Sequence, residues 1–299
     1  MAKFRQNHQN QGKDLQTTFR MVILLFVVIA ALAGGFIYYR HALFNKAAPS
    51  ATVTEDYADR TYLPSSSGEV VNHRYYSLSY MEKYEQAEWT AYMMTREMLN
   101  AENVDRNAHF NPDYSVSTRS AYHRDYSNSG YTRGHLVPAA DMAFDTLAMR
   151  ESFFMSNMSP QVKECNNGVW KELEENVRDW TYKAGTLYIV SGPVINGAYK
   201  TIGKENKVAV PHSFYKVLLD YEDPERKMIG FVIPNALSEI RLQDYMVTVD
   251  SVEKLTGIDF FKNMINDAEE EKLESTINKS NWNVSEKRYQ LRVTKWNYE

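Results

Sequence analysis

Residues 131–141 read YTRGHLVPAAD, and this stretch decides the fold together with two blocks that follow it. The second block is SNMSPQ at residues 156–161, and the third is NNGVW at residues 166–170. The first block places His135 directly after an arginine–glycine pair. The ordinary pKa of histidine lies near 6.5, so a neutral His135 can accept a proton close to physiological pH.

The third block leads into a predicted helix over residues 167–182. Its apolar residues recur at offsets of three, four and three, which is one face of a helix: Trp170, Leu173, Val177 and Trp180. A second set recurs every four residues and therefore lies along one line: Asn166, Trp170, Glu174 and Arg178. From the spacing alone, Glu174 and Arg178 could be a surface ion pair without any role in a site. Such a pair contributes roughly a few tenths of a kcal/mol to helix stability.

Strands and further helices surround these blocks without strict alternation. Strand patterns occupy residues 75–80, 88–94, 186–193, 208–211, 214–219 and 228–234. Helical patterns occupy residues 146–155 and 245–255, and Thr256-Gly257 ends the second. Interspersed elements of this kind predict an α+β fold with a mainly antiparallel or mixed sheet.

The N-terminal region predicts a membrane anchor. Residues 21–39 contain no charge and approach the ~20 residues that cross a bilayer. Basic residues dominate the segment before them, which places residues 1–20 in the cytoplasm and the later residues outside it. We expect an uncleaved signal anchor, with a cleaved signal peptide as the competing interpretation. A linker over residues 40–68 then leads to the main domain.

That main domain is expected over residues 69–262, followed by a polar and peripheral C-terminal extension over residues 263–299. Net charge is −4, and the first forty residues hold five Lys/Arg against one Asp, so the remainder carries −8. A polyanion would need a local basic patch on such a chain. The single cysteine, Cys165, excludes an intrachain disulfide and a thiolate zinc site. Cys165 is a weak candidate for a catalytic thiol, because no Cys-His signature surrounds it.

Taken together, the blocks resemble the DNA/RNA non-specific endonucleases, the ββα-metal (His-Me finger) nucleases related to mitochondrial endonuclease G. The order of the RGHLVPAAD, SNMSPQ and NNGVW blocks and of the following helix carries the resemblance, which extends over roughly residues 70–262. It implies a Mg²⁺-dependent (or Mn²⁺-dependent) endonuclease that cuts DNA and RNA with little sequence preference and leaves 5′-phosphates.

The resemblance assigns roles to individual residues. His135 would be the general base and Asn166, four residues before Trp170, the sole direct protein ligand of the metal. Asn167 is the alternative ligand if the register shifts by one. Glu174 would hold metal-bound water, and Arg178 would bind phosphate or orient Glu174.

Other positions are assigned less directly. Arg133 would contact phosphate, although a structural arginine is an equal alternative. Asn157 is expected to orient the site rather than bind metal. Arg119, or Arg124 in its place, would supply another phosphate contact. Thr132 departs from the family, which usually has aspartate there, so weaker or altered metal use is expected with activity retained.

Two other classes of function stay open from the sequence. A nuclease fold could have lost turnover and only bind nucleic acid, or the chain could tether a partner to the membrane. Members of the resembled family are often dimers, so a homodimer is the assembly to consider. A bacterial inner membrane with the domain in the periplasm is the simplest location, and a mitochondrial inner membrane is the alternative.

Overall fold

The computed structural model describes residues 21–24, 28, 31, 34–35, 59–106 and 108–299. The fold below is that of residues 59–299, within the unit Thr52–Glu299. Most of the expected anchor and linker lies outside the described residues. Within the described ranges, no helix combines the length and apolar character needed to cross a membrane.

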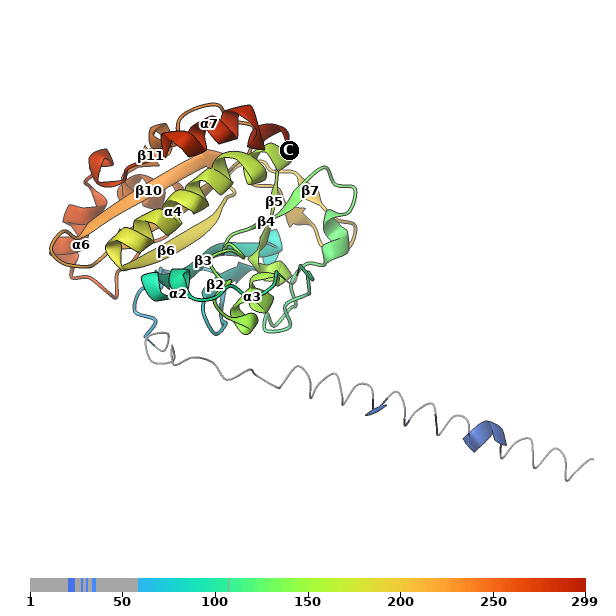
Figure 1. Ribbon diagram of the computed structural model, residues 1–299. Helices are drawn as coiled ribbons and strands as arrows, with labels where there is room; N and C mark the ends of the chain where they lie inside the picture. The colour runs from blue at the N-terminus through green and yellow to red at the C-terminus, as the bar shows by residue number, and fades with distance from the viewer. Residues whose placement is uncertain (1–20, 25–27, 29–30, 32–33, 36–58, 107) are drawn as a thin grey trace, which may run out of the picture. The chain divides into compact units, whose positions relative to one another are not determined.

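A seven-stranded sheet forms the centre of the domain (Figure 1). Its strands pair antiparallel throughout, in the order β1 (Glu69–Asn72), β2 (Ser77–Met81), β3 (Gln86–Thr95), β6 (Thr186–Val194), β9 (Ser213–Asp220), β10 (Lys227–Pro234) and β11 (Met246–Val247). The predicted α+β fold with a mainly antiparallel sheet is therefore confirmed, and the predicted strands are found with small shifts at their ends.

Both faces of the central sheet are buried, as β9 illustrates. Phe214 and Leu218 point into the core beneath α4, while Tyr215, Val217 and Leu219 point into the core on the other face. The alternation follows from the two-residue period of a strand. Lys216 therefore lies on the α4 face, although every neighbour in its strand is apolar.

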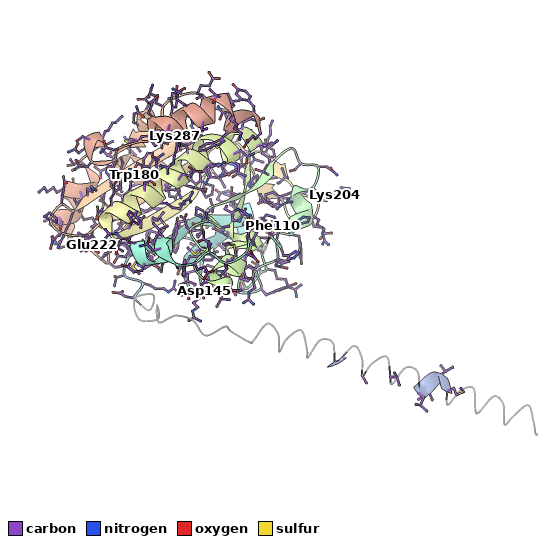
Figure 2. All side chains as sticks on the ribbon, viewed as in Figure 1. Phe110, Asp145, Trp180, Lys204, Glu222 and Lys287 are labelled. Carbon is purple, nitrogen blue, oxygen red and sulfur yellow. The ribbon has the colours of Figure 1, made fainter. Side chains whose placement is uncertain are left out.

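Helix α4 (Lys171–Ala184) covers one face of the sheet (Figure 1). Its predicted apolar face is buried, with Leu173 and Val177 in the core and Trp180 (labelled in Figure 2) stacked on Phe231 of β10. The helix ends at Gly185, which has a positive φ of 103° and donates its N–H to the carbonyl of Thr181.

The opposite face is covered by α5 (Val249–Thr256), by residues 258–265 and by α6 (Asp267–Glu274). The shorter elements are α2 (Arg96–Asn100), α3 (Thr146–Ser152), α7 (Glu286–Thr294) and two small sheets. These sheets pair β4 (Thr132–His135) with β5 (Met158–Gln161), and β7 (Thr201–Ile202) with β8 (Val208–Ala209). The predicted helices 146–155 and 245–255 correspond to α3 and α5.

The expectation of a peripheral C-terminal extension was wrong. Trp282 is buried against Trp180 with their rings edge-on at 5.3 Å, and α7 lies beside α4 (Figure 1). Arg292 of α7 is fully buried and pairs with the buried Glu172 of α4 at 2.5 Å. The polar composition concealed this packing, because a few buried side chains, rather than a continuous apolar pattern, hold the segment in place.

Candidate active site

The three sequence blocks form one compact unit of two strands and a helix. Strands β4 and β5 pair antiparallel, with Thr132 opposite Gln161 and His135 opposite Met158. A π-helical turn, Cys165–Trp170, which is kinked at Gly168, then leads into α4. Such turns widen a helix locally and are frequent at functional sites. Here the turn brings Asn166 beside β4.

His135 lies at the end of β4 in an aromatic setting. Its ring packs edge-on against Phe153 at 4.9 Å and tilted against Phe110 at 6.0 Å (Phe110 is labelled in Figure 2). Its Nε2 atom is buried and has no hydrogen-bond partner in the described part of the chain. Burial, and then the positive charge of Arg106, lower the pKa of His135 to about 3. The imidazole is therefore neutral at physiological pH, and its Nε2 atom is not occupied by a hydrogen bond within the described residues.

The backbone around His135 is held by two other elements. Trp170 donates its indole N–H to the His135 carbonyl at 3.2 Å. Asn157 is fully buried, and its side chain accepts from the N–H of Val137 at 2.9 Å while donating to the carbonyls of Val137 and Ser152. Asn157 thus clamps the chain directly after His135, which fixes where the ring stands.

Asn166 and Thr132 are in direct contact. The Asn166 side-chain amide donates from Nδ2 to the Thr132 hydroxyl at 3.1 Å, and that hydroxyl donates to the Gln161 carbonyl at 3.0 Å. With Nδ2 engaged, the Oδ1 atom of Asn166 is the end of the amide that is available to a cation. A neutral oxygen ligand suits Mg²⁺, which takes few protein oxygens and keeps several waters. The donor set therefore fits such a metal.

Gly134 is required between Arg133 and His135. A Cβ at this position would lie 2.1 Å from the side-chain oxygen of Gln161, which is buried on the paired strand. The glycine therefore leaves room for the buried Gln161 side chain beside β4.

Glu174 and Arg178 face a buried polar network beneath the π turn. Arg178 donates to Asp141 at 2.7 Å, and Asp141 also accepts from the Tyr92 hydroxyl at 2.6 Å. Burial raises the pKa of Glu174. The same network includes Lys216, whose Nζ donates to the Ser191 hydroxyl at 2.5 Å and lies over the Trp170 ring. Burial lowers the pKa of Lys216.

Sequence reasoning missed three members of this site. Asp141 stood at the end of the opening stretch but received no role, and it is the partner of Arg178. Lys216 could have been found, because a lone lysine inside an apolar strand needs a buried partner. Arg106 lies in a polar loop without a motif, and only the tertiary structure brings its charge toward His135 and Glu174.

The three arginines that were expected to contact phosphate lie in different surroundings. Arg133 places its guanidinium 4.5 Å over the Phe110 ring beside His135. Arg119 is exposed in a loop with a positive φ of 71°, and no contact joins it to His135 or Asn166 in the described ranges. Arg124 forms an exposed ion pair with Glu205.

Two of the open alternatives concern the π turn. Asn167 is half-buried but lacks the contact with β4 that Asn166 makes through Thr132. Cys165 is buried, and its thiol donates to the Pro234 carbonyl at 3.5 Å. Burial raises the pKa of Cys165 to about 12, so the thiol stays protonated and is a poor nucleophile.

The fold and this ββα unit define a class of protein, and comparison with known proteins identifies it. The family model of the DNA/RNA non-specific endonucleases matches residues 55–267, and the chain belongs to this family. The family membership predicted from the sequence blocks is thereby confirmed.

Individual relatives agree. The chain is 35% identical to the mitochondrial nuclease EXOG of Danio rerio over 215 residues, covering 67% of this chain and 62% of the relative. It is 34% identical to the mitochondrial endonuclease G of Homo sapiens over 207 residues, covering 64% and 68%. A crystal structure of the EndoG/EndoGI complex, which concerns the mechanism of EndoG inhibition, matches with a TM-score of 0.65 at 31% identity. That match covers 73% of this chain and 94% of the solved one. The chain thus spans less than two thirds of the length of the EXOG relative.

Proposed function

We propose that this protein is a Mg²⁺-dependent endonuclease that hydrolyses phosphodiester bonds of DNA and RNA with little sequence preference. The observation that carries the proposal is the arrangement of His135 and Asn166 in one ββα unit. His135 has a buried, neutral, unpartnered Nε2, and Asn166 has its amide oriented by Thr132. Family membership supports the reaction class.

In the proposed reaction, Nε2 of His135 removes a proton from the attacking water. Mg²⁺, when bound, would offset charge on the phosphate and stabilise the leaving oxygen. Asn166 would hold the metal through Oδ1, and Glu174 would accept hydrogen bonds from its waters. Asp141 fixes the Arg178 guanidinium, so Arg178 acts on Glu174 and on phosphate from a set position. Arg133, whose guanidinium stacks on Phe110, would contact phosphate beside the base.

Thr132 performs a different task from the aspartate usual in the family. Its hydroxyl accepts one hydrogen bond and donates another, so it fixes the Asn166 amide without adding negative charge. We infer that metal binding relies here on orientation rather than on a second carboxylate, which agrees with weaker metal use and retained activity.

The experiment uses the purified full chain with plasmid DNA and with RNA, in MgCl₂ or in EDTA. We expect the protein to cleave both substrates in MgCl₂ and neither of them in EDTA. His135→Ala should lower the rate by about 10²- to 10⁴-fold while a gel shift still detects binding, because a general base typically contributes that much. A variant within threefold of wild type would contradict the assignment. Nucleic-acid binding without any cleavage by wild type would favour the alternative of an impaired, binding-only protein.

We further propose that residues 21–39 anchor the protein and leave the nuclease domain outside the cytoplasm. The supporting observation is the uncharged run behind a basic tail. A bacterial inner membrane stays the simplest host, and the mitochondrial names of the relatives favour the alternative. Protease protection of membrane fractions tests the orientation.

Two protein partners can be tested by gel filtration. One is an inhibitor protein, because the solved relative is bound to one, and the other is a second copy of the chain, because members of the family are often dimers.

A further inference from the structure

A second group of carboxylates lies between α5 and α6, on the face of the sheet opposite α4. One oxygen from each of Asp250, Glu253 and Glu274 lies within 4.8 Å of the others. Asp250 and Glu253 come from α5, and Glu274 is the last residue of α6. Because α5 and α6 pack on the core opposite α4, this group is separate from the His135 and Asn166 site.

Glu274 makes this group more than an acidic surface. Its side chain is only 6% exposed, and its Oε1 atom is buried without a hydrogen-bond partner in the described residues. The neighbouring Glu270 of α6 also has a buried oxygen, Oε1, in the same condition. A carboxylate buried in this way needs either a proton or a cation to offset its negative charge.

Positive side chains do not neutralise this group, and the partner of Glu274 within it is a side-chain hydrogen bond with Glu253. Burial, then the charges of Glu253 and Glu270, raise the pKa of Glu274 to about 8. Within the described chain, none of the three clustered carboxylates forms an ion pair with Lys, Arg or His. Lys262 forms an ion pair with Asp259 at 3.7 Å, and Arg226 forms one with Glu269 at 2.9 Å.

The geometry points to a divalent cation held between α5 and α6, and we propose Ca²⁺ as the ion that fits. Calcium binds carboxylate oxygens at about 2.3–2.6 Å, so two of its ligands lie at most about 5 Å apart. The three oxygens meet that limit. Glu253 uses Oε1 to accept the N–H of Phe260 at 2.9 Å, which fixes its carboxylate. The ion would tie α6, which begins where the family match ends, to the nuclease domain.

Thermal unfolding of the EDTA-treated full chain, with and without saturating CaCl₂, tests the proposal. We expect wild type to gain about 5 °C, as a ligand that binds only the folded state stabilises it. Glu274→Gln should gain less than about 1 °C. Two controls should respond like wild type. Glu271→Gln removes the same charge from an exposed position on α6, and Asn166→Ala removes the proposed catalytic ligand.

Calorimetric titration with CaCl₂ gives the second measurement. Wild type should bind one more Ca²⁺ than Glu274→Gln, and Asp250→Asn should repeat the loss if Glu274→Gln folds poorly. A Ca²⁺ response that disappears in Asn166→Ala and survives in Glu274→Gln would overturn the proposal and assign the effect to the catalytic site. An unresponsive wild type, with Glu274→Gln more stable than wild type above pH 8, would also overturn it and show that Glu274 carries only a proton.

Discussion

At the scale of single residues, Thr132 contacts Asn166, the proposed metal ligand. A carboxylate at this position would add negative charge beside the waters of the proposed metal. The threonine hydroxyl instead accepts from the Asn166 amide and donates to the Gln161 carbonyl. Threonine therefore orients the Asn166 amide but adds no negative charge. We expect this difference to change the Mg²⁺ concentration that activity requires more than it changes the maximal rate.

Changing Thr132 separates these two contributions. Thr132→Val keeps the shape and removes the acceptor, so about 10-fold more Mg²⁺ should be needed, as is common when a group behind a metal ligand is lost. Thr132→Ser should behave like wild type. Thr132→Asp should stay active and tighten the use of Mg²⁺, because charge-assisted hydrogen bonds are roughly twice as strong as neutral ones. Activity against Mg²⁺ concentration measures all three. Equal midpoints in folded variants would exclude a role for this side chain in metal binding.

The two adjacent asparagines give a second prediction at this scale. Asn166→Ala should raise the Mg²⁺ requirement by about 10-fold or more, since it removes the proposed ligand. Asn167→Ala should have a much smaller effect, because the contact with β4 belongs to Asn166. Metal titration of both variants decides the register, and the reverse order would assign the ligand to Asn167.

At the scale of elements, α4 joins the active site to the C-terminal segment. Its apolar face packs on the sheet, the turn that precedes it carries Asn166, and another side carries the ion pair between Glu172 and Arg292. Arg292 also donates to the carbonyls of Ser238 and Ile240 at 2.5 Å. The C-terminal helix α7 therefore holds α4, and the residues after β10, from the side away from the sheet.

Breaking that contact should destabilise the domain. Arg292→Leu leaves Glu172 buried without its partner, which typically costs about 3–5 kcal/mol. Chemical denaturation measures the change. Arg241→Leu is the matched control, because Arg241 pairs with Glu286 on the exposed surface, where such pairs contribute little. Similar losses in the free energy of unfolding for both variants would mean that the buried pair stabilises the domain no more than the exposed pair does.

At the scale of the whole molecule, two segments outside β4 build the environment of His135. The loop between α2 and β4 supplies the Phe110 ring and the charge of Arg106, and Phe153 follows α3. Burial comes first and Arg106 second in lowering the pKa of His135. Together they keep the imidazole neutral far below the ordinary titration range of histidine.

This environment predicts the acid limit of activity. A base must be neutral, and its folded pKa of about 3 lies below 6.5. Activity attributable to His135 should therefore persist as pH falls through 6.5, with an acid midpoint in kcat/KM well below that value. Arg106→Ala should move the midpoint upward, because it removes a charge that disfavours the imidazolium. A wild-type midpoint at 6.5 or above, unchanged in Arg106→Ala, would contradict this account of the site.

The sequence by itself determined the family, the sheet's main strands and the apolar face of α4. These follow from local periodicity and from blocks whose order is visible in one dimension. It also singled out His135 and Asn166. Only the tertiary structure decided which of the neighbouring polar residues act together. Asp141 beside Arg178, Lys216 near Glu174, and Trp282 against Trp180 join positions far apart in the chain. Burial of charge and packing of single side chains leave no periodic pattern, so they become visible only when the chain is folded.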